Sequence, residues 1–214
     1  MPNLHPDQLR LIVITDDTLA TPRSIIDVVR VAVEAGAPAI QLRDKASTAR
    51  EMATTGRRLR EITVAADVLL FVNDRFDVAL AIEADGVHVG PDDVPVAALR
   101  RVAPPGFLIG TSTDQPDEAV RLVAEGADYI GCGAVYATST KADAGPTIGI
   151  EGLQAVVDVL DVPVVGIGGI DAHEASEIAK HTSAAGVAAI GAIMGADDPA
   201  AAVRRLLQPF EQRG

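Results

Sequence analysis

The sequence predicts an α/β protein folded as a single (β/α)8 TIM barrel that spans residues 1–214 as one domain. Three observations predict it: eight short apolar runs alternate with helical patterns, a βα unit recurs along the chain, and no linker or low-complexity segment interrupts the series. A chain of 214 residues is long enough for one well-buried domain. An open, doubly wound sheet is the alternative, and eight uninterrupted units favour the closed barrel.

The predicted strands are short, rich in β-branched residues and without apolar–polar alternation. This pattern is typical of parallel strands that are buried on both faces. Helices are expected in the intervals between them. The strands are expected at Leu11–Thr15, Ala39–Leu42, Leu69–Val72, Gly86–Val89, Leu108–Thr111, Tyr129–Cys132, Val164–Ile167 and Val187–Ile190.

Local signals mark the ends of several helices. Thr21-Pro22 and Asp198-Pro199 each predict an N-cap followed by proline at the first helical position. Gly36, Gly126 and Gly152 predict helix ends or turns. A helix end, small residues and a strand follow one another four times, which indicates a repeated βα unit. The four copies begin at Glu34-Ala35-Gly36-Ala37, Glu83-Ala84-Asp85-Gly86, Glu125-Gly126-Ala127-Asp128 and Ser183-Ala184-Ala185-Gly186.

The composition argues against several classes of protein. Hydrophobic residues make up 48% of the chain but aromatic residues only 3%, so we expect an aliphatic core. No window approaches the ~18 uninterrupted apolar residues of a membrane span, and residues 1–6 do not resemble a signal peptide. The single cysteine, Cys132, allows no intrachain disulfide and predicts a cytoplasmic location. The net charge of −12 disfavours nucleic acid as a partner, because binding a phosphate backbone requires clustered Lys and Arg.

Polar or glycine clusters follow seven of the predicted strands or the loops that leave them. Because the carboxyl ends of parallel barrel strands share one face, we expect the clusters to converge on one site. Their chemistry is that of a diphosphate held by cations, hydroxyls, backbone N–H groups and a carboxylate-bound metal. The clusters are 41–45, Asn73-Asp74, Asp92-Asp93, Ser112, Thr138–Lys141, Gly168-Gly169 and Gly191.

Glycines end the seventh and eighth predicted strands, where barrel enzymes commonly bind a phosphate. The chain has Gly168-Gly169 after one strand and Ile190-Gly191 after the next. Glycine lets backbone N–H groups approach an anion, and the N-terminus of the following helix adds positive partial charge. Tight turn packing is the alternative, but two such turns at these strand ends favour phosphate.

Carboxylates follow the third and fourth predicted strands, which are neighbours in a barrel. Asn73-Asp74 ends one strand and Asp92-Asp93 follows the other. Two carboxylates with an amide suit Mg²⁺, which keeps several waters and uses one or two protein carboxylates plus a substrate phosphate. Helix capping by Asp74 and Asp93 is the alternative, although it would not explain why both face the cations of the second strand.

Cations and hydroxyls come from two segments. Gln41, Arg43 and Lys45 alternate along an extended stretch, so all three can point to one side, while Asp44 is expected to point away. Arginine supplies a planar fork for phosphate oxygens and lysine a point charge. The long loop from about Gly133 to Ile150 predicts a lid, because such loops in compact domains are usually functional. It carries Thr138, Thr140 and Lys141; for the lysine alone, an ordinary exposed side chain is the stronger interpretation.

Four other conspicuous residues are expected to be inert. His88, within Gly86-Val87-His88-Val89-Gly90, is interpreted as a hydrogen-bonded strand histidine rather than a general base. His173 and His181 are expected on the surface in or beside the seventh helix, and Cys132 is expected to pack in the core. No Ser-His-Asp, Cys-His or His-pair arrangement is apparent.

Taken together, the clusters resemble those of the thiamine-phosphate synthase family, (β/α)8 enzymes that join the two halves of thiamine. The resemblance extends over nearly the whole chain, from residue 11 to residue 199. Its motifs are Gln-x-Arg-x-Lys at 41–45, Asn-Asp-Arg at 73–75, Gly-Val-His-Val-Gly at 86–90, Gly-x-Ser at 110–112, Asp-Tyr-Ile-Gly at 128–131, Thr-x-Thr-Lys at 138–141 and Ile-Gly-Gly-Ile at 167–170.

The resemblance implies a transferase reaction. Aminohydroxymethylpyrimidine diphosphate would lose pyrophosphate to give a pyrimidine-methyl cation, which the nitrogen of hydroxyethylthiazole phosphate, or of its carboxylated tautomer, would capture. Arg43, Lys45, Lys141 and Ser112 would be catalytic, and Asp74 and Asp93 would hold Mg²⁺. The residues implied to bind substrate are Gln41, Arg43, Lys45, Asn73, Ser112, Thr138, Thr140, Lys141, Gly168, Gly169, Ile190 and Gly191.

Three positions depart from the family pattern. Asp44 stands where Glu is usual, Pro91 where Gln is usual, and Gly191 where Ser is frequent. Gly191 removes a hydroxyl but keeps the backbone N–H. A thiazole tautomerase on the same fold and a non-catalytic regulatory binder of thiamine precursors are the alternative functions. The expected partners are the two small-molecule substrates, with no nucleic acid and no membrane, and a homo-oligomer is left open.

Overall fold

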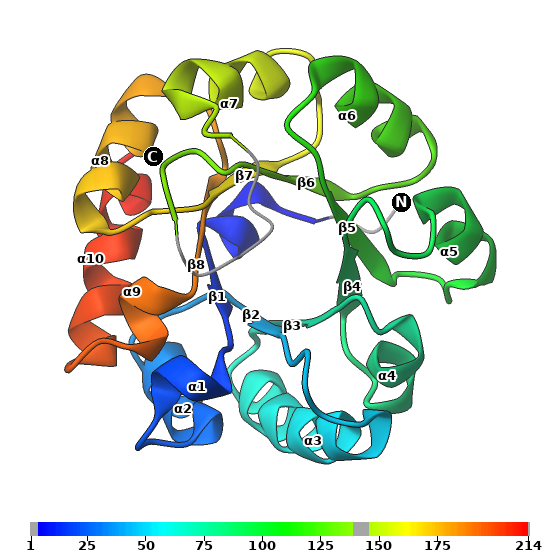
Figure 1. The fold of residues 1–214 in the computed structure, drawn as a ribbon, viewed down its shortest axis with the longest axis vertical. Coiled ribbons are helices and arrows are strands. Elements are labelled where there is room, and N and C mark those ends of the chain that lie inside the picture. Colours follow the sequence, from blue (N-terminus) through cyan, green and yellow to red (C-terminus); the bar gives the residue numbers. More distant parts are fainter. Residues whose placement is uncertain (1–3, 139–145, 214) are drawn as a thin grey trace.

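Eight parallel strands close into a barrel in the computed structural model, which describes residues 4–138 and 146–213. The strands pair in chain order, and the eighth pairs with the first, so the sheet has no free edge. The helices form an outer ring around the barrel (Figure 1). The predicted (β/α)8 fold is confirmed, and the open sheet is excluded.

The strands lie where the sequence predicts them, with ends that differ by at most one residue. The largest difference is in the eighth strand, which begins at Gly186 and ends at Ala189, because Ile190 already precedes a short helix. The strands are β1 Leu11–Ile14, β2 Ala39–Leu42, β3 Leu69–Asn73, β4 Gly86–Val89, β5 Leu108–Ser112, β6 Tyr129–Cys132, β7 Val164–Ile167 and β8 Gly186–Ala189.

Helices follow the strands around the ring. Within the described residues, no helix combines the length and apolar composition that crossing a membrane requires. A short 3-10 helix, η1, at Pro6–Leu9 precedes β1. The α-helices are α1 Asp17–Ala20, α2 Ile25–Glu34, α3 Ala49–Ala65, α4 Phe76–Ala81, α5 Val96–Val102, α6 Pro116–Ala124, α7 Gly149–Val157, α8 Ala172–His181, α9 Gly191–Met194 and α10 Pro199–Glu211.

Two of the predicted helix boundaries are wrong. Thr21 ends α1, and α2 begins later, after Ser24, whose hydroxyl caps it; proline therefore marks a turn here rather than a helix start. Gly152 lies inside α7 instead of ending it. By contrast, Asp198 caps α10 with proline at its first position, as predicted. Glycines at 36 and 126 follow α2 and α6 with positive φ, also as predicted.

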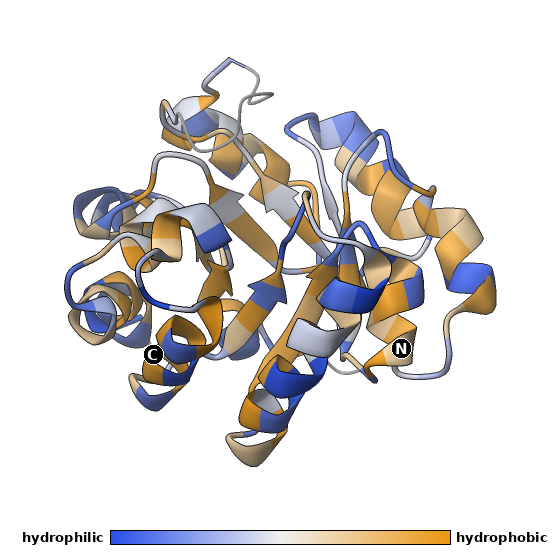
Figure 2. Ribbon diagram, turned by 60° about the horizontal axis from the view of Figure 1, so that its bottom comes forward, coloured by the Kyte–Doolittle hydropathy of each residue, from blue (hydrophilic) through white to orange (hydrophobic). Residues whose placement is uncertain are grey.

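Apolar side chains fill two layers. One lies between the barrel and the helices, and Figure 2 shows the strands and the inner helix faces as hydrophobic, with polar residues outside. The other lies inside the barrel. The core is largely aliphatic, but the barrel interior holds the rings of Phe71 and Tyr129, packed edge to face with centroids 5.2 Å apart. These rings were not foreseen in a chain so poor in aromatic residues.

The repeated βα unit contains a repeated carboxylate clamp. Asp85, just before β4, accepts from the backbone N–H of Leu70 on β3 and pairs with Arg60 at 2.7 Å. Asp128, just before β6, accepts from the N–H of Ile109 on β5 and pairs with Arg100 at 2.5 Å. Both clamps lie where strands begin, at the end of the barrel opposite the predicted site.

Candidate active site

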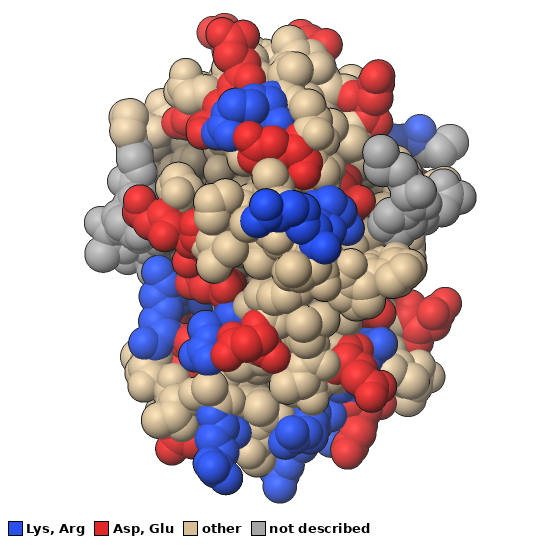
Figure 3. All heavy atoms as spheres, turned by 90° about the vertical axis from the view of Figure 1, so that its right-hand side faces the viewer, with Lys and Arg blue, Asp and Glu red and all other residues tan. Residues whose placement is uncertain are grey.

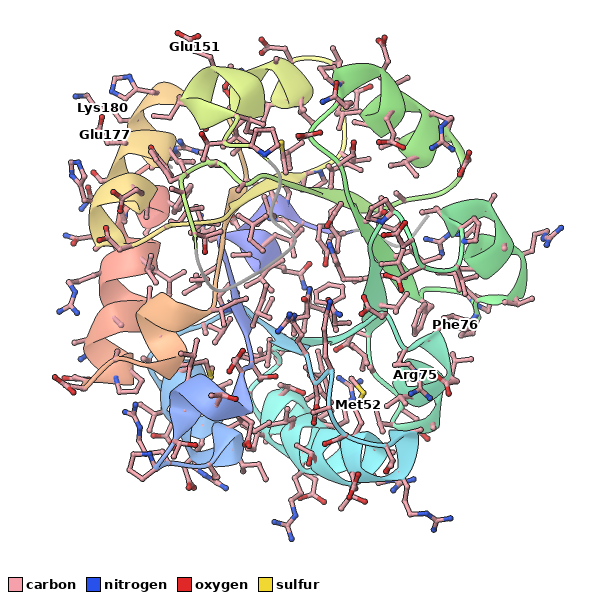
Figure 4. The ribbon with its side chains drawn as sticks, in the orientation of Figure 1. Met52, Arg75, Phe76, Glu151, Glu177 and Lys180 are labelled. Carbon is pink, nitrogen blue, oxygen red and sulfur yellow. The ribbon has the colours of Figure 1, made fainter. Side chains whose placement is uncertain are left out.

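The described site residues gather where β2 to β8 end, which is the arrangement predicted for them. Side chains from the strands fill the centre of the ring in Figure 4, whereas the labelled Glu151, Glu177 and Lys180 lie on its periphery. Arg75 also lies away from the centre and pairs with Asp77 at 2.6 Å, although it follows Asn73-Asp74 directly.

Arg43 is held in place by a residue that the sequence did not single out. The hydroxyl of Thr15, fully buried after β1, accepts from the Arg43 N–H at 2.9 Å and donates to the Arg43 carbonyl at 3.1 Å. The guanidinium lies 3.7 Å from the carboxylate of Asp16. Thr15 thereby fixes the backbone from which Arg43 projects.

Asp44 has the structural role that was expected of it. Its carboxylate accepts from the backbone N–H groups of Ala46 and Ser47, both at 2.9 Å, and so shapes the turn after β2. Lys45 is exposed and near enough to Asp74 to lower the pKa of that carboxyl group. Within the segment 41–45, Arg43 and Lys45 therefore remain candidate functional residues, whereas Asp44 forms the turn.

Asp74 and Asp93 approach each other closely enough to share a hydrogen bond. Burial first, and then the neighbouring Asp93 carboxylate, raise the pKa of Asp74 to about 6, against the opposing effect of Lys45 and Arg43. The backbone of Asp74 is also unusual, with φ of 63°, a conformation that often marks functional sites in residues other than glycine. Asp93 is anchored by accepting from the Gly90 N–H at 2.7 Å.

Neither carboxylate caps a helix, so the capping alternative is wrong. α4 follows Arg75 and α5 follows Pro95, and neither helix has a side-chain cap. Two adjacent carboxylates with too little positive charge nearby fit a divalent cation, as the raised pKa of Asp74 indicates. Among the described residues, no group of three or more His, Cys, Asp or Glu side chains is placed to hold a metal ion.

A row of polar side chains crosses the barrel interior between the strands. The ring of His88 lies between Tyr129 and Ser112, with Nδ1 2.9 Å from the tyrosine hydroxyl and Nε2 2.8 Å from the serine hydroxyl. Tyr129 in turn hydrogen-bonds Gln41. His88 is thus the hydrogen-bonded strand histidine that was predicted, but it is also in contact with a candidate site residue.

A cavity of about 480 Å³ opens over β5 to β8. Six of the predicted substrate-binding residues line it: Ser112, Thr138, Gly168, Gly169, Ile190 and Gly191. Arg43, Asn73 and Asp93 are not among its lining residues, so only part of the set that was expected to converge on one site lines this cavity. After β2 to β4 the side chains are paired instead, Arg43 with Asp16 and Asp74 with Asp93.

The glycines after β7 have a packing role as well. Gly169 has φ of 62°, and a Cβ there would lie 2.4 Å from the carbonyl oxygen of Ala137. The N-terminus of α8 is already capped by Asp171, which accepts from the His173 N–H at 2.7 Å. At the start of α9, by contrast, the N-cap residue Ile190 makes no side-chain cap.

The remaining candidates divide into described and undescribed residues. Thr140 and Lys141 lie outside the described residues. His173 and His181 are exposed on α8, as expected. Burial, with a smaller contribution from Asp114, raises the pKa of the Cys132 thiol to about 12, which confirms an inert, packed cysteine.

A closed (β/α)8 barrel with cations, paired carboxylates and a glycine-lined cavity at the carboxyl ends of its strands defines a TIM-barrel enzyme that handles phosphorylated small molecules. The family model described as thiamine monophosphate synthase matches residues 11–193. The chain belongs to this family, and it is accordingly a transferase of thiamine biosynthesis.

Individual relatives agree with the family. The thiamine-phosphate synthase of Roseiflexus castenholzii is 46% identical over 94% of this chain and 88% of that protein. The one of Pyrococcus furiosus is 44% identical over 96% and 97%. The solved structure of thiamine phosphate pyrophosphorylase from Pyrococcus furiosus superposes with a TM-score of 0.88, at 42% identity, over 97% of this chain and 98% of that one. Nothing in these comparisons supports the tautomerase or regulatory alternatives.

Proposed function

We propose that this chain joins aminohydroxymethylpyrimidine diphosphate to hydroxyethylthiazole phosphate, giving thiamine phosphate and pyrophosphate. The observation that carries the proposal is the adjacency of two compartments at one end of the barrel. Arg43, Lys45 and the Asp74–Asp93 pair form the first, and the 480 Å³ cavity is the second. Ser112 belongs to both, because it lines the cavity and is linked through His88 to the strand that precedes Asp93.

The diphosphate is assigned to the first compartment. Arg43 and Lys45 would bind its oxygens, with Asn73 at the end of β3 and Gln41 on β2 beside it. Enzymes of this family depend on a metal ion. We assign the ion here as Mg²⁺ and its ligands as Asp74 and Asp93. When bound, the cation would neutralise charge that develops on the departing diphosphate.

The thiazole phosphate is assigned to the cavity. Backbone N–H groups at Gly168-Gly169 and at Ile190-Gly191, where uncapped α9 begins, suit its phosphate. Thr138 adds a hydroxyl from the loop after β6, and Thr140 and Lys141 would extend this set. The position of the cavity would place the thiazole nitrogen next to the pyrimidine carbon that loses pyrophosphate.

The residues promote a dissociative substitution. The bond between the pyrimidine methylene and the diphosphate breaks first, and pyrophosphate leaves with the bonding electron pair. Preorganised cations that stabilise the growing negative charge lower this barrier, which is the role proposed for Arg43, Lys45 and Lys141. Ser112 orients the pyrimidine so that the thiazole nitrogen attacks the cation along one path.

The remaining expectations accompany this function. We propose one catalytic domain over residues 1–214, a cytoplasmic location and no macromolecular substrate, with the homo-oligomer left open. The single cysteine and the net charge of −12 support these points.

The decisive experiment is formation of thiamine phosphate from the two substrates with Mg²⁺, compared with the Asp93→Asn variant. The variant keeps the side-chain shape but loses the charge, so kcat should fall by about 10²–10³-fold, as when one preorganised electrostatic contact is removed. Because Asp93 caps no helix, the melting temperature of the variant should stay close to that of the wild type. A fully active variant would remove Asp93 from the metal site, and no product from the wild type would refute the function.

A further inference from the structure

The polar row inside the barrel joins four strands through consecutive hydrogen bonds. Gln41 comes from β2, His88 from β4, Ser112 from the end of β5 and Tyr129 from β6. Gln41 is 3% exposed and Tyr129 fully buried, so water does not compete freely for these groups. The row ends at Ser112, which is the member that lines the cavity.

The two rings fit because neighbouring strand positions lack side chains. A Cβ at Gly110, the cross-strand partner of Tyr129, would lie 2.1 Å from the tyrosine Cζ. A Cβ at Gly131 would lie 3.0 Å from His88 Cε1 and 3.6 Å from the Ser112 hydroxyl oxygen. Both rings therefore occupy fixed positions before any substrate binds.

The donors and acceptors of the row define a direction. Gln41 hydrogen-bonds the Tyr129 hydroxyl, and its amide N–H can donate to the tyrosine oxygen in that bond. The Tyr129 oxygen accepts from Gln41, so its single O–H is available for His88 Nδ1, 2.9 Å away. A neutral His88 that accepts at Nδ1 carries its proton on Nε2 and donates it to Ser112 at 2.8 Å.

We propose that Tyr129 and His88 are positioning residues that fix the Ser112 hydroxyl as a hydrogen-bond donor toward the cavity. Since the serine oxygen already accepts from His88, its own O–H is free to point at an acceptor atom of the bound pyrimidine diphosphate. This inference rests on the proposed function, which places Ser112 beside that substrate. It predicts that an interior tyrosine affects catalysis without touching the substrate.

The first test is the protonation state of His88, which needs no substrate. His5, His173 and His181 are exposed, so a triple variant with Gln at these positions leaves His88 as the only histidine signal. A protein labelled with ¹⁵N-histidine should show a neutral ring protonated at Nε2. Protonation at Nδ1, or a doubly protonated ring near neutral pH, would overturn the inference, because the bond directions would differ.

The second test is a double-mutant cycle on turnover. Tyr129→Phe removes only the hydroxyl and should lower kcat by roughly tenfold, within the range of losses seen for mispositioned catalytic groups. The same change in a Ser112→Ala background should have little further effect, because Tyr129 acts through Ser112. Thr63→Val is the control: it also removes a fully buried hydroxyl, which donates to the Arg60 carbonyl within α3, and its activity should equal that of the wild type.

The outcomes separate this inference from the function on which it rests. If Ser112→Ala lowers kcat, and Tyr129→Phe lowers kcat in that background by the same factor as in the wild type, the positioning role is refuted and the proposed function stands. If Ser112→Ala turns over like the wild type, Ser112 does no work in the site and the inference fails with that assignment. Should Tyr129→Phe fail to fold, the His88 measurement on the triple variant still decides between the two bond directions.

Discussion

Thr15 shows how an uncharged, buried residue controls a charged one. Its hydroxyl makes two hydrogen bonds to the backbone of Arg43, and its position at the end of β1 joins the first strand to the cation cluster of the second. Nothing in its sequence context distinguishes it from an ordinary core threonine. Its importance follows from the parallel register that sets Ile14 beside Gln41.

Thr15→Val should therefore affect diphosphate binding more than its size suggests. The variant leaves the Arg43 N–H without its acceptor, at a cost of ~1–3 kcal/mol in stability, and lets the guanidinium shift. A loss of about 1.4 kcal/mol in binding corresponds to a KM for the pyrimidine diphosphate that is about tenfold higher. Steady-state kinetics measure this directly.

Thr63→Val is the matched control for that experiment. Thr63 is equally buried, but its hydroxyl donates to the Arg60 carbonyl within α3, away from the site. We expect a stability loss of ~1 kcal/mol and an unchanged KM. Equal KM values in the two variants would show that Thr15 is only a core residue.

Asp74 gives the protein a pH-dependent stability when no metal is bound. Its pKa rises from the ordinary value of 3.8 to about 6 on folding, so the folded state holds the proton more tightly than the unfolded chain. The resulting stabilisation is present below about pH 4 and is lost as the pH rises through about 6. Above that pH, the charged carboxylate destabilises the metal-free fold.

Asp74→Asn removes this titration and tests it. In the presence of a chelator, the variant should be more stable than the wild type at pH 7.5, and the difference should shrink as the pH falls from 6 to 4. Urea unfolding at each pH supplies the comparison. A difference that grows on acidification would mean that the pKa is lowered rather than raised.

At the scale of elements, the two carboxylate clamps show why the βα units share an aspartate before a strand. Asp128 has a side chain only 8% exposed, and Arg100 also donates to the carbonyls of Gly126 and Phe107. The equivalent Arg60–Asp85 pair is more open, at 25% and 26% exposure. The same sequence motif thus produces clamps of unequal strength.

Arg100→Met should lower the free energy of unfolding by about 3 kcal/mol, because it strands a buried carboxylate. Arg60→Met, the matched change at the more exposed clamp, should cost about 1 kcal/mol. Both clamps lie opposite the active site, so kcat should not change in either variant well below its melting temperature. A larger loss in Arg60→Met would contradict this ranking.

The elements themselves were predictable, whereas contacts across the barrel were not. Buried parallel strands have a local signature, and all eight were located to within one residue. The predicted helix start at Thr21-Pro22 was wrong, because a proline fits a turn as well as a first helical position. The hydroxyl that caps α2 belongs to Ser24. The row from Gln41 to Ser112 could not be inferred, because it depends on which side chains meet across the barrel. Its traces in the sequence were His88, which was expected to be hydrogen-bonded, and the glycines at 110 and 131 within strands.

At the scale of the whole molecule, the chain carries a net charge of −12. On the face shown in Figure 3, Lys and Arg side chains alternate with Asp and Glu, without a large area of one sign. The excess negative charge therefore acts as general self-repulsion. Local pairing, as between Arg43 and Asp16, keeps a cation in the site despite this background.

Salt should consequently stabilise the metal-free protein. Raising NaCl from ~10 mM to ~150 mM shortens the screening length from about 30 Å to about 8 Å and weakens the repulsion. A gain of about 1 kcal/mol would raise the melting temperature by roughly 2–4 °C for a chain of this size. A scanning calorimetry series with a chelator present measures it, and a melting temperature that falls with NaCl would show that attractive pairs dominate.

Because Gly110 on β5 has no side chain, the ring of Tyr129 on β6 fills the space beside it. The two positions therefore share one volume. Neither residue can change its volume alone: alanine at 110 would collide with the ring, and a small residue at 129 would leave a void under the active site. Exchanged together, they would tolerate the same total volume in another division. Homologues should accordingly trade bulk between these two positions, and a redesign of the barrel floor for a larger substrate should begin by changing them as a pair.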